Sequence, residues 1–126
     1  MKVSTYLGIS GAIAIFFGLA FLLAPESSSK QYGIPADPHV LMLGRYFGAT
    51  LLSPGIIFWC VRATRDDMVL RALLRGATAA NLGGLVVSVW AGLSGLQNAM
   101  AWFSVAVYGL LLLGALYFLT SPGRRA

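Results

Sequence analysis

The sequence predicts an all-α integral membrane protein: one domain, residues 1–126, folded as a bundle of four transmembrane helices with both termini in the cytoplasm. The chain is 58% hydrophobic and only 10% charged, whereas ordinary soluble domains are about 25% charged. Its charges are also confined to short stretches, because residues 3–25 and 76–123 carry none and residues 38–61 carry a single arginine. A small soluble core cannot bury so much apolar surface, so lipid must solvate it.

The uncharged stretches are long enough for four crossings, since about 20 apolar residues span a bilayer as a helix. We expect helices at about residues 4–24, 39–61, 70–93 and 99–120. The segment GLSGLQN, residues 92–98, has the glycines and polar residues of a tight turn and separates the last two helices. The segment 25–39 contains three prolines and three consecutive serines, and it is predicted to be irregular.

The basic residues predict the orientation of the bundle. In a four-crossing arrangement, one side receives Lys2, Arg62, Arg65, Arg71, Arg75, Arg124 and Arg125. The other side receives only Lys30. The positive-inside rule therefore places both termini in the cytoplasm. The net charge of +5 then reflects topology, and no nucleic-acid binding is expected.

The predicted inner loop contains a signal for the start of the third helix. Thr64 is followed by Arg65, Asp66 and Asp67, a pattern that resembles a capping box, in which the threonine hydroxyl accepts a backbone N–H of the first turn. Arg71 and Arg75 follow one turn apart, so their side chains share a face at the height of the lipid headgroups. We expect this pair to contact anionic lipid phosphates.

Small residues recur in the predicted helices at spacings that allow two backbones to approach closely. Gly44 and Gly48 form a GxxxG motif around Arg45, and Gly8 and Gly11 lie on the first helix. In lipid, helices associate through such close contacts rather than through the hydrophobic effect. We expect the glycines to pack helices within one chain, with a homodimer as the alternative.

Arg45 is the one charged residue inside a predicted span, within LGRYFGAT at residues 43–50. It lies about six residues, or roughly 9 Å, from the outer end of its helix. Two interpretations stay open. The guanidinium extends to the outer interface, with Asp37 or Glu26 as its counter-ion, or it faces the bundle and binds an anionic or carbonyl group.

Depth along the helices predicts which residues share a site with Arg45. Tyr46 is adjacent in sequence, and Ser88 and Ser104 come to a similar level on the third and fourth helices. The predicted ligand site is therefore an outer-half pocket made by Arg45, Tyr46, Ser88 and Ser104. Asn81 lies roughly 10 Å deeper, and we expect it to form a separate interhelical hydrogen bond.

The remaining residues argue against most catalytic chemistry. The only histidine is His39 and the only cysteine is Cys60, so a bis-histidine haem, a zinc site and an iron site all lack ligands. No carboxylate lies within a predicted span, although proton-coupled exporters commonly use one. His39 and Cys60 lie at opposite ends of one helix, so neither can activate the other. We expect no enzyme activity, no metal and no cofactor.

Three segments carry a resemblance to known families: LGRYFGATLLSPGIIFWCVRATRDD, RALLRGATAANLGGL and NAMAWFSVAVYGLLLLGALYFL. Together they cover nearly the whole chain, which resembles small bacterial four-helix membrane proteins of the DoxX-like kind. The R-x-F-G-x-x-L-L-S segment is also distantly similar to the ergosterol-biosynthesis scaffold family, which tethers sterol enzymes. The matching positions are Arg45, Phe47, Gly48 and Ser53. The resemblance implies a four-helix bundle in the inner (plasma) membrane of a bacterium, with a non-catalytic accessory or scaffold function.

We therefore expect an integral membrane accessory protein that contacts membrane lipids. It would act through helix and loop contacts with another membrane protein or with a second copy of itself. The alternative is a binder or carrier of a hydrophobic molecule, such as a lipid, a sterol or a quinone, held in the outer-half pocket around Arg45.

Overall fold

The computed structural model describes residues 1–121 and 123, which form five α-helices and no strand. The helices are α1 (Val3–Leu23), α2 (Pro25–Gln31), α3 (Pro38–Val61), α4 (Asp67–Leu93) and α5 (Met100–Thr120). Four of them, α1, α3, α4 and α5, are long and apolar enough to cross a membrane. The all-α class and the four long apolar helices are thus confirmed, with every bound within three residues of the predicted one.

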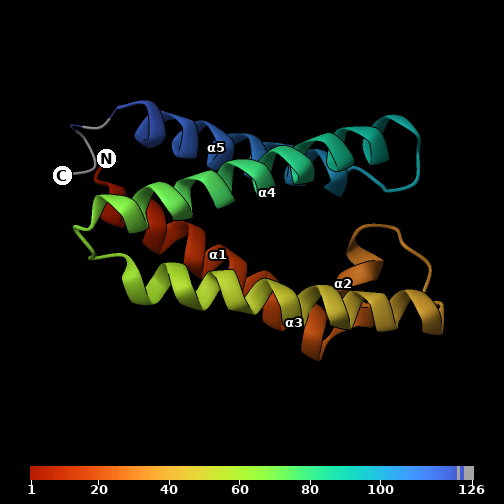
Figure 1. Cartoon of the computed structure of the whole chain (residues 1–126). Helices are drawn as coiled ribbons and strands as arrows, with labels where there is room; N and C mark the ends of the chain where they lie inside the picture. The colour runs from red at the N-terminus through yellow and green to blue at the C-terminus, as the bar shows by residue number, and fades with distance from the viewer. Residues whose placement is uncertain (122, 124–126) are drawn as a thin grey trace.

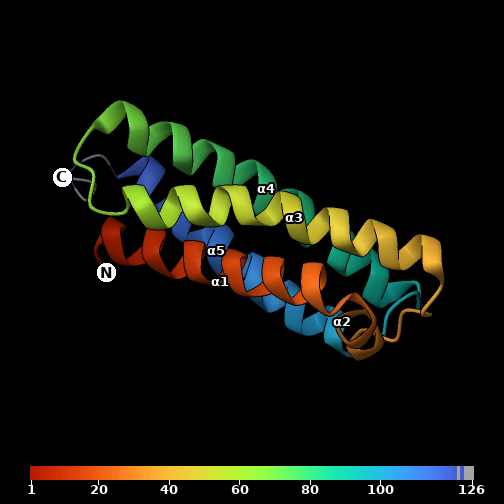
Figure 2. The ribbon, with the colours of Figure 1, turned by 90° about the horizontal axis from the view of Figure 1, so that it is seen from below.

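The long helices form two antiparallel pairs, α1 with α3 and α4 with α5 (Figure 1). The start of α1, the α3–α4 loop and the end of α5 lie together at one end of the molecule, which we call the termini end (Figures 1 and 2). Helix α2 and the α4–α5 loop lie at the opposite end, the α2 end. The two pairs meet at the termini end and diverge toward the α2 end (Figure 1).

This arrangement gathers most of the described basic residues toward the termini end. The termini end and the first turns of α4 carry Lys2, Arg62, Arg65, Arg71 and Arg75, and the α2 end carries Lys30. Arg124 and Arg125 lie outside the described residues.

Glycines bring the backbones of α1 and α3 into close contact. A Cβ added to Gly48 would lie 2.5 Å from the carbonyl oxygen of Gly18, and one added to Gly11 would lie 2.8 Å from that of Gly55. Gly11 and Gly18 thus face Gly55 and Gly48 in antiparallel register, seven residues apart on each helix. We call these four residues the glycine seam. It packs α1 against α3 within one chain, and close contacts of small residues of this kind are typical of helix packing in membranes.

The two helix pairs meet in an apolar core at the termini end. Its most deeply buried side chains are Leu7, Leu70, Leu74 and Phe118. The ring of Tyr6 packs against that of Phe118 with centroids 5.7 Å apart. The Tyr6 hydroxyl donates to the carbonyl oxygen of Leu111 at 2.7 Å, which ties α1 to α5.

Helix α2 occupies part of the segment that the sequence predicted to be irregular, so that prediction was wrong for residues 25–31. Pro25 lies at the first helical position. A backbone N–H at that position forms no hydrogen bond within the helix, so proline loses nothing by lacking one. Glu26 lies in the first turn and Lys30 in the last, each at the end that the helix dipole favours. The Ser28 hydroxyl donates to the carbonyl oxygen of Ala20 at 3.0 Å and holds α2 against α1.

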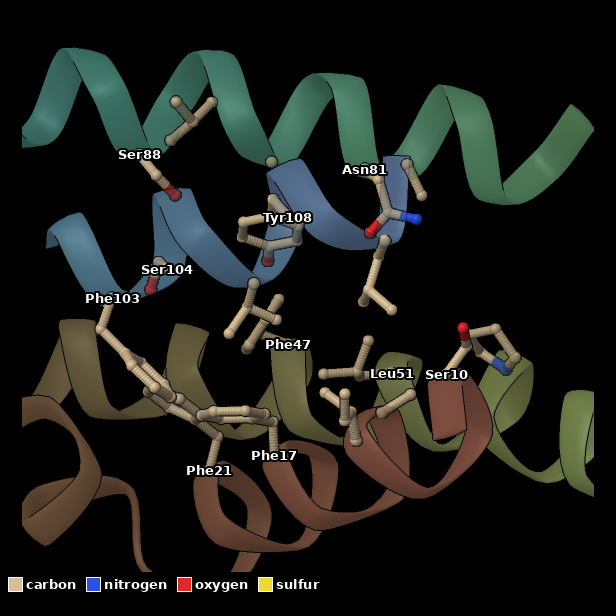
Figure 3. A pocket seen from close by; sticks show the side chains of 18 of the residues that line it. Ser10, Phe17, Phe21, Phe47, Leu51, Asn81, Ser88, Phe103, Ser104 and Tyr108 are labelled. Atoms are coloured by element: carbon tan, nitrogen blue, oxygen red, sulfur yellow. The ribbon is translucent and has the colours of Figure 1, made fainter. Parts of the chain in front are cut away.

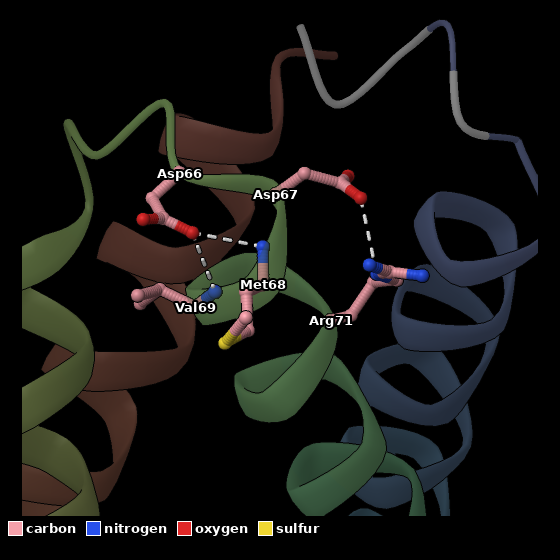
Figure 4. A network of polar contacts seen from close by, with 5 residues as sticks. All are labelled: Asp66, Asp67, Met68, Val69 and Arg71. Carbon is pink, nitrogen blue, oxygen red and sulfur yellow. Dashed lines mark hydrogen bonds and ion pairs between the residues drawn. The ribbon is translucent and has the colours of Figure 1, made fainter.

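Asp66, rather than Thr64, caps α4. Its carboxylate accepts the backbone N–H groups of Met68 at 2.9 Å and of Val69 at 3.1 Å (Figure 4). The Thr64 hydroxyl oxygen accepts the N–H of Asp66 itself at 3.3 Å. The N-cap therefore lies two residues after the predicted one, because aspartate is an equally good N-cap and its charge suits a helix N-terminus.

Candidate functional site

A cavity of about 540 Å³ lies between the two helix pairs, on the α2 side of the apolar core (Figure 3). All four long helices contribute to its walls. Tyr32, Ile34 and Gln97 line it from the loops at the α2 end. No charged side chain is among the described residues that line it.

The cavity exists because the inward-facing residues of α4 become smaller along the helix. At spacings of three and four residues, this stripe runs Leu70, Leu74, Ala77, Asn81, Gly84, Ser88 and Ala91. The two leucines fill the core at the termini end. The smaller residues that follow cannot fill the widening space between the diverging helix pairs.

Helix α5 changes in the same way toward the α2 end. Its inward stripe runs from Phe118 and Leu111 to Ser104 and Ala101. Tyr108, in the middle, lies so close to α4 that a Cβ at Gly84 would collide with its ring. Glycine at that position therefore lets Tyr108 lie against α4.

The two walls of the cavity differ in chemistry (Figure 3). Helices α1 and α3 contribute apolar side chains, among them Phe17, Phe21, Phe47 and Leu51. The rings of Phe21 and Phe47 meet edge to face with centroids 5.3 Å apart. Helices α4 and α5 contribute the polar groups of Asn81, Ser88, Ser104 and Tyr108. The cavity is therefore mostly apolar, and its hydrogen-bonding side chains on the long helices lie on α4 and α5, with Ser10 of α1 in addition.

Hydrogen bonds close the cavity at the α2 end. Asn98, in the α4–α5 loop, donates its backbone N–H to the carbonyl oxygen of Tyr32 at 3.0 Å. Its side-chain amide donates to the carbonyl oxygen of Gln31 at 2.8 Å. The Ser104 hydroxyl donates to the phenolic oxygen of Tyr32 at 3.1 Å. The helix pairs are thus joined at both ends, with the cavity between the two junctions.

Ser10 is a buried polar group without a hydrogen bond. Its side chain lines the cavity and the residue is only 8% exposed. Tyr6, one turn earlier, is near enough to interact with it, and the Tyr6 oxygen can still accept a hydrogen bond although its hydroxyl donates to Leu111. Ser10 Oγ nevertheless forms no hydrogen bond of normal geometry in the described structure. Buried polar groups are nearly always paired, so Ser10 indicates a partner from outside the chain.

No family model, curated protein or solved structure matches this chain. The resemblance to DoxX-like proteins and to the ergosterol-biosynthesis scaffold family stays a prediction.

The structure brings together two of the four residues predicted to form the ligand pocket. Ser88 and Ser104 both line the cavity, whereas Arg45 and Tyr46 are exposed and are not among its lining residues. The reason is the direction of the side chains around α3. Successive residues of a helix are about 100° apart, so Arg45 points roughly opposite to Phe47, which faces the cavity.

Asn81 is buried, as expected for a polar contact inside the bundle. The sequence predicted a hydrogen bond from Asn81 to another helix. In the structure, Asn81 Nδ2 donates within α4, to the carbonyl oxygen of Ala77 at 2.7 Å. Its side chain also lines the cavity.

Sequence reasoning did not identify Ser10, the phenylalanines of α1 or Tyr108 as lining residues. The signal that could have found the cavity is the row of small and polar residues on the inward stripes of α4 and α5. Asn81 and Ser88 are seven residues apart on one face of α4, and Ser104 and Tyr108 are one turn apart on α5.

Arg71 and Arg75 are exposed near the start of α4. Arg71 Nε lies 3.0 Å from Asp67 Oδ2, one turn earlier (Figure 4). Both side chains are about half exposed, and ion pairs of this kind contribute little to stability. Contact of the two arginines with lipid headgroups stays a prediction.

Proposed function

We propose that this chain is an integral membrane protein that binds one small, uncharged hydrophobic molecule in the cavity between its helix pairs. The observation that carries the proposal is the cavity itself, which is mostly apolar and has a few hydrogen-bonding groups, most of them on α4 and α5. Ligand sites are typically clefts of about 300–1,000 Å³ that are mostly apolar and contain a few placed polar groups. A volume of about 540 Å³ falls within that range.

The lining favours an uncharged ligand over the anionic group considered for Arg45. An ion transferred to an apolar site without a counter-charge loses far more solvation energy than an amide or hydroxyl does. No described lining residue carries a charge. The hydroxyl and amide groups of Ser10, Asn81 and Ser88 suit a neutral molecule with hydrogen-bonding atoms.

The ligand reaches the cavity from the bilayer, between α3 and α4. These helices are neighbours in both views of the ribbon (Figures 1 and 2). Phe47 and Pro54 on α3, and Ala80 and Val87 on α4, both line the cavity and are exposed on the outer surface. Such an apolar opening faces hydrocarbon in a membrane, so a lipid-soluble molecule can enter without crossing the headgroups.

The orientation is part of the same proposal. The termini end, with its basic residues, faces the cytoplasm, and the α2 end faces the outside of a bacterial inner membrane. The accessory or scaffold function, acting on a membrane-protein partner or a second copy, stays a prediction from the sequence.

Filling the cavity tests the proposal. Ser88 is 7% exposed and lines the cavity, so Ser88→Phe places a ring inside it. Val86, two residues earlier, is 60% exposed and does not line the cavity, so Val86→Phe is the matched control. Each variant is purified from membranes in mild detergent, and the hydrophobic molecules that remain bound are identified by mass spectrometry of the intact complex.

We expect a defined molecule to remain with the parent protein and with Val86→Phe, and to be lost from Ser88→Phe. Thermal unfolding of the three proteins confirms that each is folded. Equal retention by all three proteins would refute binding in the cavity.

A further inference from the structure

We propose that Ser10 and Asn81 form a seat for the hydroxyl group of a lipid alcohol. The proposal rests on the cavity function above and names the class of its ligand. The two residues come from different helix pairs, Ser10 from α1 and Asn81 from α4, and both line the same cavity (Figure 3). Each is only 8% exposed.

The seat lies deep in the bundle. Asn81 is fourteen residues after Asp67, or roughly 21 Å along a helix of about 40 Å. At that depth in a bilayer, no bulk water is present to satisfy a polar side chain. An unpaired hydroxyl at that depth destabilises the protein. A ligand that forms a hydrogen bond with the hydroxyl removes that free-energy cost.

The hydrogen bond of Asn81 fixes the direction of its amide. A carbonyl oxygen can only accept, so the atom that reaches Ala77 at 2.7 Å must be the nitrogen. The amide oxygen then turns toward the cavity, as drawn in Figure 3. The seat therefore offers an acceptor, Asn81 Oδ1, and an uncommitted hydroxyl, Ser10 Oγ.

This pair of groups matches an alcohol better than other uncharged polar groups. A ligand hydroxyl donates its proton to Asn81 Oδ1 and accepts the proton of Ser10 Oγ through the same oxygen atom. A ketone, a quinone carbonyl or an ether only accepts, so it would leave Asn81 Oδ1 unpaired. Specificity of this kind arises because a missing partner leaves a buried polar group unsatisfied.

The rest of the cavity suits the apolar body of such a molecule. From the seat toward the α2 end, the wall contributed by α1 and α3 presents Phe17, Phe21 and Phe47. Because Phe47 is also exposed, a chain longer than the cavity can extend between α3 and α4 into the bilayer.

The test compares an alcohol with its methyl ether. Pyrenebutanol and its methyl ether share one apolar body and differ in a single hydrogen-bond donor, and pyrene accepts excitation energy from tryptophan. Binding to the purified protein in lipid nanodiscs is measured by energy transfer from the protein's tryptophans. The variants are Ser10→Ala and Asn81→Leu, with Ala79→Leu as control, since Ala79 is exposed on α4 and does not line the cavity.

We expect the parent protein and Ala79→Leu to bind the alcohol about tenfold more tightly than the ether, since the ether leaves the buried Asn81 Oδ1 unpaired. Asn81→Leu should bind both probes with equal affinity. Ser10→Ala should weaken both probes alike, because the oxygen of either probe accepts from Ser10 Oγ. Circular dichroism shows whether each variant is folded.

Equal affinity for the two probes in the parent protein would overturn the seat and leave the cavity function standing. Water bound between Ser10 and Asn81 in place of a ligand would give that result. A preference that survives Asn81→Leu, or unchanged affinity for both probes in Ser10→Ala, would also overturn the seat. Saturable binding of neither probe would overturn the seat and the proposed function together.

Discussion

Replacing Gly48 with alanine tests whether the glycine seam determines the packing of α1 on α3. The added Cβ would lie 2.5 Å from the carbonyl oxygen of Gly18, 2.5 Å from the backbone nitrogen of Leu22 and 3.0 Å from the carbonyl carbon of Phe21. All three are backbone atoms, so no side-chain rotation relieves the clash and the helices must separate. Overpacking costs about 1–3 kcal/mol, and rigid backbone on both sides places this site at the upper end.

Helix propensity acts in the opposite direction. Alanine is better than glycine in a helix interior by about 1 kcal/mol. We therefore expect Gly48→Ala to lower the free energy of unfolding by about 2 kcal/mol, as the difference between a clash of about 3 and a gain of about 1. The measurement is unfolding by sodium dodecyl sulfate in mixed micelles, followed by circular dichroism.

Gly83→Ala is the matched control. Gly83 lies in the interior of α4, and a Cβ there meets nothing within 4 Å. This variant should gain stability by up to about 1 kcal/mol, because only propensity acts. If Gly48→Ala is as stable as the parent or gains as much as Gly83→Ala, the close contact between α1 and α3 does not exist in the protein.

Three further predictions concern a helix cap, the topology and Arg45. Asp66→Ala removes both N-cap hydrogen bonds of α4 and should cost about 1 kcal/mol in the same unfolding assay; an unchanged midpoint would contradict a stabilising cap. In a Cys60→Ser background, Lys30→Cys should react with an impermeant maleimide in intact cells and Arg65→Cys only after lysis, whereas the opposite pattern would invert the orientation. Arg45→Ala should leave retention of the bound molecule unchanged, because Arg45 is exposed and does not line the cavity; loss of the molecule would place the guanidinium in the site.

The long helices could be predicted because lipid imposes a simple requirement on the sequence. Apolar stretches of about 20 residues with few or no charges are rare in soluble chains and necessary in membrane helices. The positions of such stretches therefore predicted α1, α3, α4 and α5, although α3 contains Arg45. Helix α2 was not predicted, because its segment is rich in prolines and serines, which favour turns. Its helical residues are fixed by Pro25 at the first position, by the charges at its two ends and by contact with α1.

The candidate site was predicted less well than the helices. The prediction used the depth of each residue along its helix and ignored the side of the helix on which each side chain lies. Counting residues from the membrane boundary placed Arg45 level with Ser88 and Ser104, but it did not show on which side of α3 the arginine lies. The pattern was available in the sequence. Phe47, Leu51, Pro54 and Phe58 recur at spacings of four, three and four residues, and that stripe lies roughly opposite to Arg45.

The size of the cavity favours an occupant. Left empty, a space of about 540 Å³ would deprive the side chains that line it of packing contacts. The two helix pairs cannot close it, because the apolar core holds them at one end and the contacts of Tyr32 with Asn98 and Ser104 hold them at the other. A lipid chain entering between α3 and α4 would fill the space, but hydrocarbon makes no hydrogen bond to Ser10 or to the oxygen of Asn81. A molecule with both an apolar body and a polar group satisfies the volume and the polar wall together, which is the physical reason for assigning this cavity a specific ligand.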